Sequence, residues 1–160
     1  MNERKMNSPA GTLYLAADTS GLCAVRLLRE GEDVPGHSDM PVLVEAERQL
    51  LAYFAGELRR FDLLLSAQGT PFELAVWRRL EEIAYGDLES YGSIASQLGR
   101  PGAARAVGGA CARNPLLIVV PCHRVVAASG RLTGFAAGLE VKRRLLALEG
   151  WTIEEDRVCR

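Results

Sequence analysis

The sequence predicts an α+β protein of two small domains, residues 1–69 and residues 70–160. Two observations indicate this fold class. A hairpin pattern followed by an amphipathic helix occupies the first half, and short helices joined by a tight glycine-containing turn occupy the second. With 160 residues, of which 48% are hydrophobic and 24% charged, the chain can bury a core and is too apolar to be disordered.

The first domain carries no candidate chemistry. Its expected elements are a hairpin of residues 12–17 and 22–28 around Asp18-Thr19-Ser20-Gly21, a helix over residues 42–58 and a short strand over residues 61–65. In the helix, Ala46, Leu50 and Phe54 recur on one face, as in a helix that packs on a sheet. We therefore expect a scaffolding role for this domain.

The second domain opens with a strong helix start. Thr70 stands at the N-cap, Pro71 follows in the first turn, and Glu73 completes a capping box. The apolar stripe of this helix is Phe72, Val76, Leu80 and Ile83, and Gly86 ends it. A short helix over residues 93–98, the turn 99–102 and a third helix over residues 103–113 then predict a helix-turn-helix.

The third helix is unusual because it contains two glycines. Gly108 and Gly109 each cost about 1 kcal/mol relative to alanine inside a helix, so a close approach should compensate. One interpretation is tight packing against another helix. The other is contact with the sugar-phosphate wall of a narrow DNA groove, with Arg105 projecting into the groove. The sequence alone leaves both open.

A reactive cysteine is the most informative feature of the second domain. The apolar, strand-like stretch of residues 116–120 leads directly into Pro121-Cys122-His123-Arg124-Val125. A thiolate is a strong nucleophile, and a neighbouring histidine and arginine can favour its formation. A buried structural cysteine is the alternative, since an isolated Cys-His pair is usually no more than that.

Composition limits the remaining possibilities. The four cysteines are scattered without a CxxC pair, and the sequence holds only two histidines, so we expect no metal site and no disulfide framework. No apolar run approaches the ~20 residues of a membrane helix, and we expect a cytoplasmic protein with reduced thiols. Residues 1–69 carry 7 basic and 10 acidic side chains, whereas residues 70–150 carry 10 and 7. This weak asymmetry favours the second domain as the binding face for any polyanion.

The second domain closely resembles the O6-alkylguanine-DNA alkyltransferase family (methylated-DNA–protein-cysteine methyltransferases), and the resemblance runs without a gap over half of the chain. The matching motifs are Gly69-Thr70-Pro71-Phe72, Val76-Trp77, Tyr85-Gly86, Ser90-Tyr91-Gly92, Ala104 to Ala110, Asn114-Pro115, Val120 to Val126, Leu132-Thr133-Gly134-Phe135 and Leu145 to Gly150. Residues 1–69 resemble only loosely the ribonuclease-H-like domain of that family.

The resemblance implies direct repair of O6-alkylguanine in double-stranded DNA, with O4-alkylthymine as an open second substrate. The alkyl group would move irreversibly to Cys122, one per protein molecule, without a cofactor. His123 would deprotonate the thiol through a water, and Glu149 would orient the imidazole. Glu149 has the alternative of a solvent-facing residue at a helix end. Asn114 would fix the turn before the cysteine.

The resemblance also implies a surface that binds a flipped nucleotide, approached from the minor groove by a monomeric protein. The implied DNA-binding residues are Arg105, which would fill the vacated base stack, with Tyr91, Ala104, Gly108, Gly109 and Ser93. The implied substrate pocket comprises Pro121, Val125, Phe135 and Ala136. Tyr91 would donate to guanine N3, the carbonyls of Cys122 and Val125 would accept from the exocyclic amine, and the Ala136 N–H would address the alkylated oxygen.

Some positions depart from the family pattern. Ala84 replaces a common proline, Leu117 stands where a second proline is frequent, and Ala137 lies in a stretch that usually has more glycine. We expect the methyl of Ala137 to narrow access for benzyl-type adducts. Cys111 is interpreted as a small helix filler, with a second alkylatable thiol as the alternative.

Three other classes of protein remain to be excluded. A non-catalytic lesion-binding relative would lack the reactive Cys122. A cysteine hydrolase would need an oxyanion hole, of which the sequence gives no sign. A winged-helix regulator would read the major groove with long polar side chains, whereas the third helix has mostly small ones.

Overall fold

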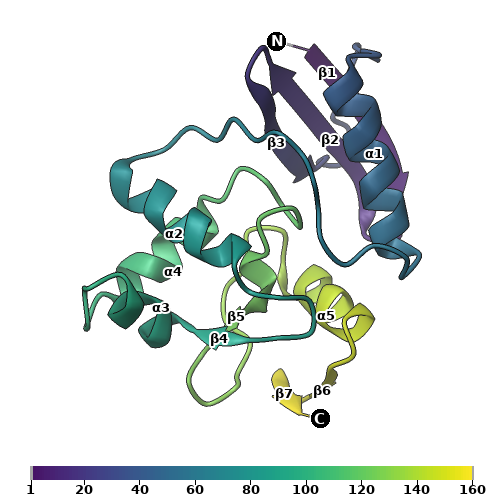
Figure 1. The fold of residues 1–160 in the computed structure, drawn as a ribbon. Coiled ribbons are helices and arrows are strands. Elements are labelled where there is room, and N and C mark those ends of the chain that lie inside the picture. Colours follow the sequence, from purple (N-terminus) through teal and green to yellow (C-terminus); the bar gives the residue numbers. More distant parts are fainter. Residues whose placement is uncertain (1, 160) are drawn as a thin grey trace. The chain divides into compact units, whose positions relative to one another are not determined.

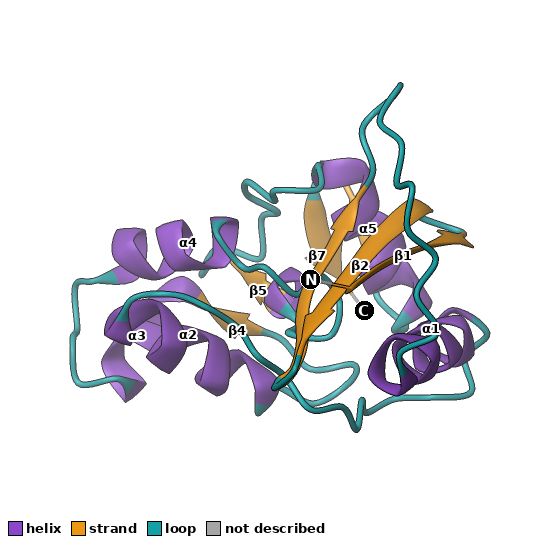
Figure 2. Cartoon of the chain, turned by 90° about the horizontal axis from the view of Figure 1, so that it is seen from above, coloured by secondary structure: helices purple, strands orange, loops and turns teal. Residues whose placement is uncertain are grey.

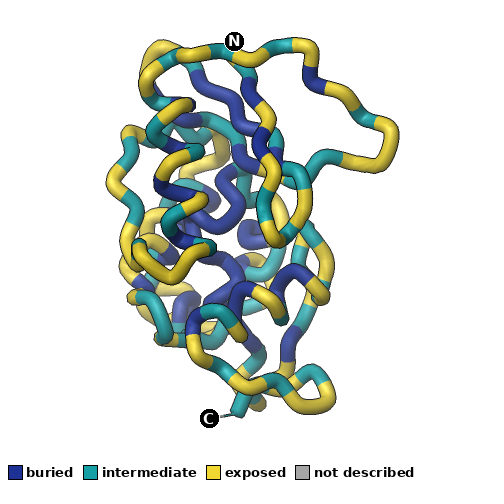
Figure 3. The backbone as a smooth tube through the Cα atoms, turned by 90° about the vertical axis from the view of Figure 1, so that its right-hand side faces the viewer, coloured by how far each residue is buried: buried dark blue, intermediate teal, exposed yellow. Residues whose placement is uncertain are grey.

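The computed structural model describes residues 2–159, which form two compact units. Unit 1 comprises residues 1–68 together with residues 115–119, and unit 2 comprises residues 69–114 and 120–160. The short segment before the cysteine thus belongs by its contacts to the unit of the N-terminal half. Buried residues are interspersed with exposed ones along most of the backbone, and residues 116–126 form the longest unbroken buried run (Figure 3).

Unit 1 is a three-stranded antiparallel sheet with one helix against it (Figure 1). Its elements are β1 (Asn2–Ser8), β2 (Gly11–Asp18), β3 (Gly21–Leu27) and α1 (Pro41–Phe54). The sheet order is β1-β2-β3, so the predicted hairpin is confirmed as β2 and β3. On α1, Leu43, Ala46, Leu50 and Tyr53 are buried, and Tyr53 takes the inward place expected of Phe54.

Strand β1 has no counterpart in the sequence prediction because its inward positions are not uniformly apolar. Arg4 and Met6 point inward in an otherwise polar run. Arg4 is only 8% exposed, and its guanidinium donates to Glu47 of α1 at 3.2 Å and to the Ser38 carbonyl at 3.0 Å. A partly buried ion pair therefore stands where a pattern search expects an aliphatic side chain.

Two strand predictions are wrong. Of residues 61–65, only Leu65 pairs, through an isolated bridge to Leu22. Residues 116–120 form an isolated bridge at Leu116, a turn over residues 117–119 and a bend instead of a strand, although all five are buried. Ile118 has φ 72°, and the Val119 N–H donates to the Leu117 carbonyl across it. The apolar composition of this segment correctly predicted that it is buried. It did not predict the backbone conformation, because buried turns and buried strands contain the same residue types.

Unit 2 is mainly helical, and its secondary structure is seen most easily in Figure 2. Its elements are α2 (Pro71–Glu81), β4 (Glu89–Ser90), α3 (Tyr91–Gln97), α4 (Ala104–Ala112), the 3₁₀ turn η1 (Cys122–Arg124), β5 (Val125–Val126), α5 (Leu139–Leu148), β6 (Thr152–Glu154) and β7 (Arg157–Cys159). No helix among the described residues is long and apolar enough to cross a membrane.

The start of α2 and the helix-turn-helix are confirmed. The Glu73 N–H donates to Thr70 Oγ1 at 3.1 Å, and Glu73 Oε1 accepts from the Thr70 N–H at 2.9 Å. Helix α2 ends at Glu81, earlier than predicted, and a turn leads to Gly86. Helices α3 and α4 pack on each other, and Trp77 of α2 donates its indole N–H to the Ala110 carbonyl of α4 at 2.9 Å.

A short parallel pairing brings the helix-turn-helix to the cysteine turn. Strand β4 pairs with β5, with Glu89 opposite Val125 and Ser90 opposite Val126. Because Ser90 also caps α3, Tyr91 starts that helix directly beside the strand that leaves η1. The fold thereby gathers motifs that lie 30 or more residues apart in the chain, such as Tyr91 and Cys122.

Candidate active site and DNA interface

Cys122 lies in a turn whose backbone is set by the preceding proline. Pro121 has φ −81° and ψ 64°, and the Cys122 N–H donates to the Val120 carbonyl at 2.8 Å. These are the angles and the hydrogen bond of an inverse γ-turn, and a proline ring already restricts φ to this region. The Cys122 side chain is buried, with 4% of the residue exposed.

Asn114, just beyond α4, links the end of that helix to this turn by hydrogen bonds. Its side-chain amide Nδ2 donates to the Val120 carbonyl at 2.8 Å and to Cys122 Sγ at 3.2 Å. An amide donor aimed at sulfur stabilises a thiolate relative to a thiol. The asparagine therefore both fixes the turn and favours ionisation of the cysteine.

His123, Arg124 and Glu149 form a buried cluster around one carboxylate. Glu149 Oε2 lies 2.7 Å from His123 Nε2, and Arg124 bonds both carboxylate oxygens, at 2.8 and 3.1 Å. The Gly86 N–H adds a further bond to Glu149 Oε1 at 3.2 Å. Glu149 is 6% exposed, so the alternative of a solvent-facing residue is wrong. Arg124 holds the carboxylate in a bidentate ion pair and also donates to the Ile83 carbonyl at 2.7 Å.

The state of His123 follows from this cluster. Burial lowers its pKa, and the hydrogen bond and charge of Glu149 oppose that effect without reversing it, so the imidazole is neutral at neutral pH. With Nε2 donating to the carboxylate, Nδ1 carries the lone pair. That Nδ1 atom is buried and has no hydrogen-bond partner among the described residues. The ring is therefore held as a base whose accepting atom is not used by the fold.

Lys142 is a component of the site that sequence reasoning missed. It is fully buried on α5, and Nζ donates to the Val125 carbonyl at 2.7 Å and to the Thr133 carbonyl at 3.3 Å. Nζ also lies 5.9 Å from the centroid of the Tyr91 ring. Within residues 2–159 no carboxylate forms an ion pair with it. A signal was present, because Lys142 falls on the apolar face of α5, where a lysine is rare.

The charge of Lys142 acts on the nucleophile. Burial raises the pKa of Cys122, whereas the hydrogen bond from Asn114 and then the charge of Lys142 lower it. Burial in turn lowers the pKa of Lys142 to about 8, and the nearby thiols Cys122 and Cys111 act to raise it. A buried cation without a carboxylate partner and a buried thiol thus favour each other's charged form.

A hollow of about 570 Å³ opens between α4 and the segment before α5. Its lining residues are Tyr91, Ala104, Arg105, Gly108, Ala112, Thr133, Gly134, Phe135 and Ala136. This volume is in the range of sites for small organic molecules. Burial raises the pKa of Tyr91, so its phenol stays protonated at neutral pH, and it accepts a hydrogen bond from Thr133 Oγ1 at 3.1 Å. The phenol hydrogen is then available to a ligand.

The hollow brings together six of the predicted binding residues, namely Tyr91, Ala104, Arg105, Gly108, Phe135 and Ala136. Arg105 is exposed at this surface. A Cβ on Gly108 would lie 3.8 Å from the Tyr91 ring, which is ordinary contact, so the glycine leaves the hollow wider and is not needed to avoid a clash.

The other predicted binding residues lie elsewhere. Gly109 faces the Arg113 side chain, and the Ser93 N–H donates to the capping Ser90 Oγ at 3.1 Å. Pro121 and Val125 are buried behind the surface, as is Cys122, and none of them lines the hollow. The Val125 carbonyl is already bonded to Lys142, which leaves it one lone pair for a ligand. Ala137 also does not line the hollow.

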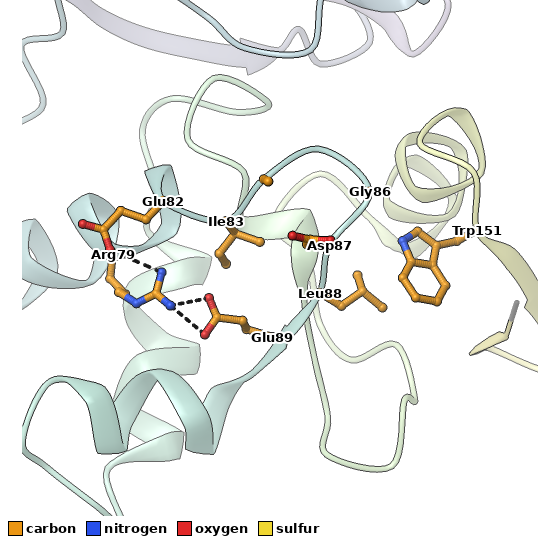
Figure 4. A pocket seen from close by; sticks show the side chains of 9 residues that line it. Arg79, Glu82, Ile83, Gly86, Asp87, Leu88, Glu89 and Trp151 are labelled. Carbon is orange, nitrogen blue, oxygen red and sulfur yellow. Dashed lines mark hydrogen bonds and ion pairs between the residues drawn. The ribbon is translucent and has the colours of Figure 1, made fainter.

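A second hollow of about 440 Å³ lies on unit 2 near residues 82–89 (Figure 4). The Arg79–Glu89 ion pair lines one side, and Leu88 and Trp151 lie close together at the other end. Cys122, His123, Arg124 and Glu149 do not line it, although Ile83 and Gly86, which bond Arg124 and Glu149 through their backbones, do. Among residues 2–159 no group of three or more histidine, cysteine, aspartate or glutamate side chains is arranged to hold a metal ion, and all four cysteines are free thiols.

Comparison with known proteins agrees with this geometry over nearly the whole chain. The family model described as "6-O-methylguanine DNA methyltransferase, ribonuclease-like domain" matches residues 1–67, and the model of the corresponding DNA binding domain matches residues 71–151. The chain belongs to the 6-O-methylguanine DNA methyltransferase family. The predicted family and the predicted fold, a ribonuclease-like domain followed by a DNA-binding domain, are therefore confirmed.

Relatives in this family are similar throughout their length. The methylated-DNA–protein-cysteine methyltransferase of Methanosarcina acetivorans is 49% identical over 147 residues, which are 89% of this chain and 94% of that protein. The crystal structure of the Mycobacterium tuberculosis O6-methylguanine methyltransferase has a TM-score of 0.83 at 49% identity, covering 92% of both chains. The structure of the M. tuberculosis protein in complex with DNA has a TM-score of 0.85 at 48% identity, covering 93% of this chain and 92% of that one.

Proposed function

We propose that this methyltransferase repairs O6-alkylguanine in double-stranded DNA by moving the alkyl group from the guanine oxygen to Cys122. The observation that carries the proposal is a buried thiol that accepts a hydrogen bond from Asn114, feels the charge of Lys142 and is followed in the chain by the buried His123–Glu149 pair. Relatives about 49% identical bear the name of this activity. O4-alkylthymine is proposed as a second substrate.

In the proposed reaction, His123 takes the proton of the Cys122 thiol, through a water at Nδ1, and Glu149 stabilises the resulting imidazolium. Sγ then attacks the alkyl carbon; the S–C bond forms as the C–O bond to guanine breaks. The thiol hydrogen is balanced by the proton that the released guanine regains. Tyr91 donates to guanine N3 as negative charge develops on the leaving base.

The base must leave the duplex to reach a buried sulfur, so the reaction requires base flipping. We propose that α4 lies in the minor groove, that Arg105 fills the space of the flipped base, and that the lesion enters the hollow bounded by Tyr91 and Phe135. The exposure of Arg105 and the small residues Ala104 and Gly108 beside it support this arrangement. Gly109 and Ser93 are proposed to support DNA binding through the backbone of their helices, because their Cβ positions face other parts of unit 2.

The product is a thioether, which has no carbonyl for water to attack. Each protein molecule therefore acts once, as a monomer, and no cofactor takes part. We propose that it acts in the cytoplasm, where thiols stay reduced. Cys111 is a poor competing acceptor, because burial raises its pKa to about 12.

The experiment that tests the proposal is intact-mass measurement after incubation with a duplex that carries one O6-methylguanine. We expect one methyl group per wild-type molecule, located on Cys122 by peptide mapping. Cys122→Ala should gain none, and Cys111→Ala, which removes a thiol outside the proposed chemistry, should gain one. Tight binding to the lesion with no change in mass would contradict the proposal and indicate a lesion sensor.

A further inference from the structure

The C-terminal β6–β7 hairpin lies outside the residues that the family model matches, which end at residue 151. Strand β6 pairs with β7, with Thr152 opposite Cys159 and Glu154 opposite Arg157. The turn residues Glu155 and Asp156 have φ 50° and 58°, so the hairpin closes with two residues in the left-handed region. The family match therefore assigns no role to this element.

The hairpin pairs with residues 130–132, which precede the rim of the hollow, residues 133–136. Leu132 N–H donates to the Asp156 carbonyl at 2.7 Å, and Val158 N–H donates to the Gly130 carbonyl at 3.0 Å. Arg131 and Arg157 form an antiparallel bridge between these two bonds. The backbone of residues 130–132 is thereby fixed immediately before Thr133, the first rim residue that lines the hollow.

Side-chain packing reinforces the backbone contacts. Leu132 is 3% exposed and packs in a cluster with Val126 and Leu146. Ile153 and Val158 of the hairpin cover this cluster, together with Leu88, Leu139 and Trp151. Figure 4 shows Leu88 and Trp151 close to each other. The apolar cluster that contains Leu132 is thus covered by side chains from both strands of the hairpin.

The hairpin is itself anchored to α5. Arg143 on that helix donates through Nε to Asp156 Oδ1 at 2.9 Å, and its Nη2 lies 2.7 Å from the same oxygen. Lys142, the preceding residue, donates to the Thr133 carbonyl from inside the site. Residues 133–138 therefore span two fixed points, the hairpin-bound Leu132 and the start of α5 at Leu139.

We propose that the β6–β7 hairpin is a positioning element that sets the rim of the alkyl pocket and thereby determines which adduct sizes react with Cys122; this inference rests on the function proposed above. The rim residues Thr133, Phe135 and Ala136 face the incoming lesion, and Thr133 also bonds the Tyr91 phenol. A small displacement of such groups changes reaction rates strongly, whereas overall affinity for DNA depends on other residues. A rim released from the hairpin accommodates a benzyl group better and aligns a methyl group less well.

The test uses the full chain with Ile153→Ala and Val158→Ala combined, because these changes remove cover from Leu132 and leave every residue of the proposed chemistry in place. Leu43→Ala is the matched control, since it removes a buried side chain of α1 in unit 1. For each protein, transfer rates are measured from duplexes with one O6-methylguanine or one O6-benzylguanine, at a temperature at which all are folded.

We expect the double variant to shift the benzyl-to-methyl rate ratio upward by about fivefold or more, while the control stays within about twofold of wild type. Amide hydrogen exchange over residues 133–138 should accelerate in the double variant alone. An unchanged ratio with unchanged exchange, despite a lowered melting temperature, would overturn the proposal and leave the hairpin as a stabilising element only. Failure of the wild-type protein to transfer either group would instead refute the proposed function.

Discussion

Replacing Lys142 with methionine should remove one component of the pH dependence of stability. Burial lowers the pKa of this lysine from 10.5 to about 8 in the folded protein. Between these two pH values the Lys142 side chain binds more protons in the unfolded chain than in the folded one, so the contribution of Lys142 to the free energy of unfolding rises with pH across this window. The difference between the two pKa values of Lys142 corresponds to about 3 kcal/mol in the free energy of unfolding. Methionine does not titrate, and the variant should lack this rise.

At neutral pH the net change in stability should be small, because two effects oppose each other. The variant no longer buries an ammonium group, which is favourable. It also leaves the carbonyls of Val125 and Thr133 without their Lys142 donor, at about 1–3 kcal/mol for each buried group. Alkyl transfer should nevertheless slow at neutral pH, because the charge of Lys142 lowers the pKa of Cys122 and its removal leaves less thiolate.

The assay is urea unfolding of wild type and Lys142→Met at several pH values from about 7.5 to about 10.5, with transfer rates measured in parallel. Lys5→Met is the matched control: Lys5 is half exposed and paired only with an exposed Asp33. Its stability curve should run parallel to that of wild type. If the Lys142→Met curve is also parallel to wild type over this range, the ammonium is not desolvated as argued and the reasoning is refuted.

Three further substitutions test other parts of the site. Asn114→Ala removes the donor that lowers the pKa of Cys122, so the midpoint of the pH–rate profile for transfer should move upward; an unmoved midpoint would contradict this role. Arg105→Ala should slow repair of duplex O6-methylguanine by about tenfold or more but change the reaction with free O6-benzylguanine base by less than about twofold, and equal losses would count against a role in base flipping. Glu149→Gln leaves Arg124 as a buried cation with no charged partner, and urea unfolding should show a loss of about 3–5 kcal/mol; a loss below about 1 kcal/mol would show that the cluster is not the buried network described here.

Local sequence signals predicted the local structure of unit 2 well. The capping box of Thr70 and Glu73 is a short-range hydrogen-bond pattern, and the turn between α3 and α4 depends on glycines at residues 99 and 102, both with positive φ. Such features are decided within a few residues, so the chain carries them in readable form. At the cysteine, Pro121 favours the backbone angles that the structure adopts, but the sequence prediction placed a strand before it and did not predict the turn.

Long-range partners decided what the sequence left open. Strand β1 is stabilised by the pairing of Arg4 with Glu47, and the apolar residues 116–120 adopt turns because their neighbours in unit 1 offer only an isolated bridge at Leu116. Neither outcome has a local signature. A pattern of burial identifies which residues are inside, but backbone conformation there depends on which hydrogen-bond partners the fold supplies.

The sequence by itself determined which groups could carry the chemistry of this protein: a thiol directly after a proline, a histidine beside it, and a helix of small residues that contains an arginine. Only the tertiary structure decided the electrostatics of that chemistry. Three contacts between segments distant in the chain matter here: Lys142 bonds the Val125 carbonyl, Arg124 bonds Glu149, and the β6–β7 hairpin bonds residues 130–132. Burial strengthens the interactions of those charged groups with their neighbours, because the protein interior screens charge less than water does. Burial depends on the whole folded structure and cannot be read from the order of the residues alone.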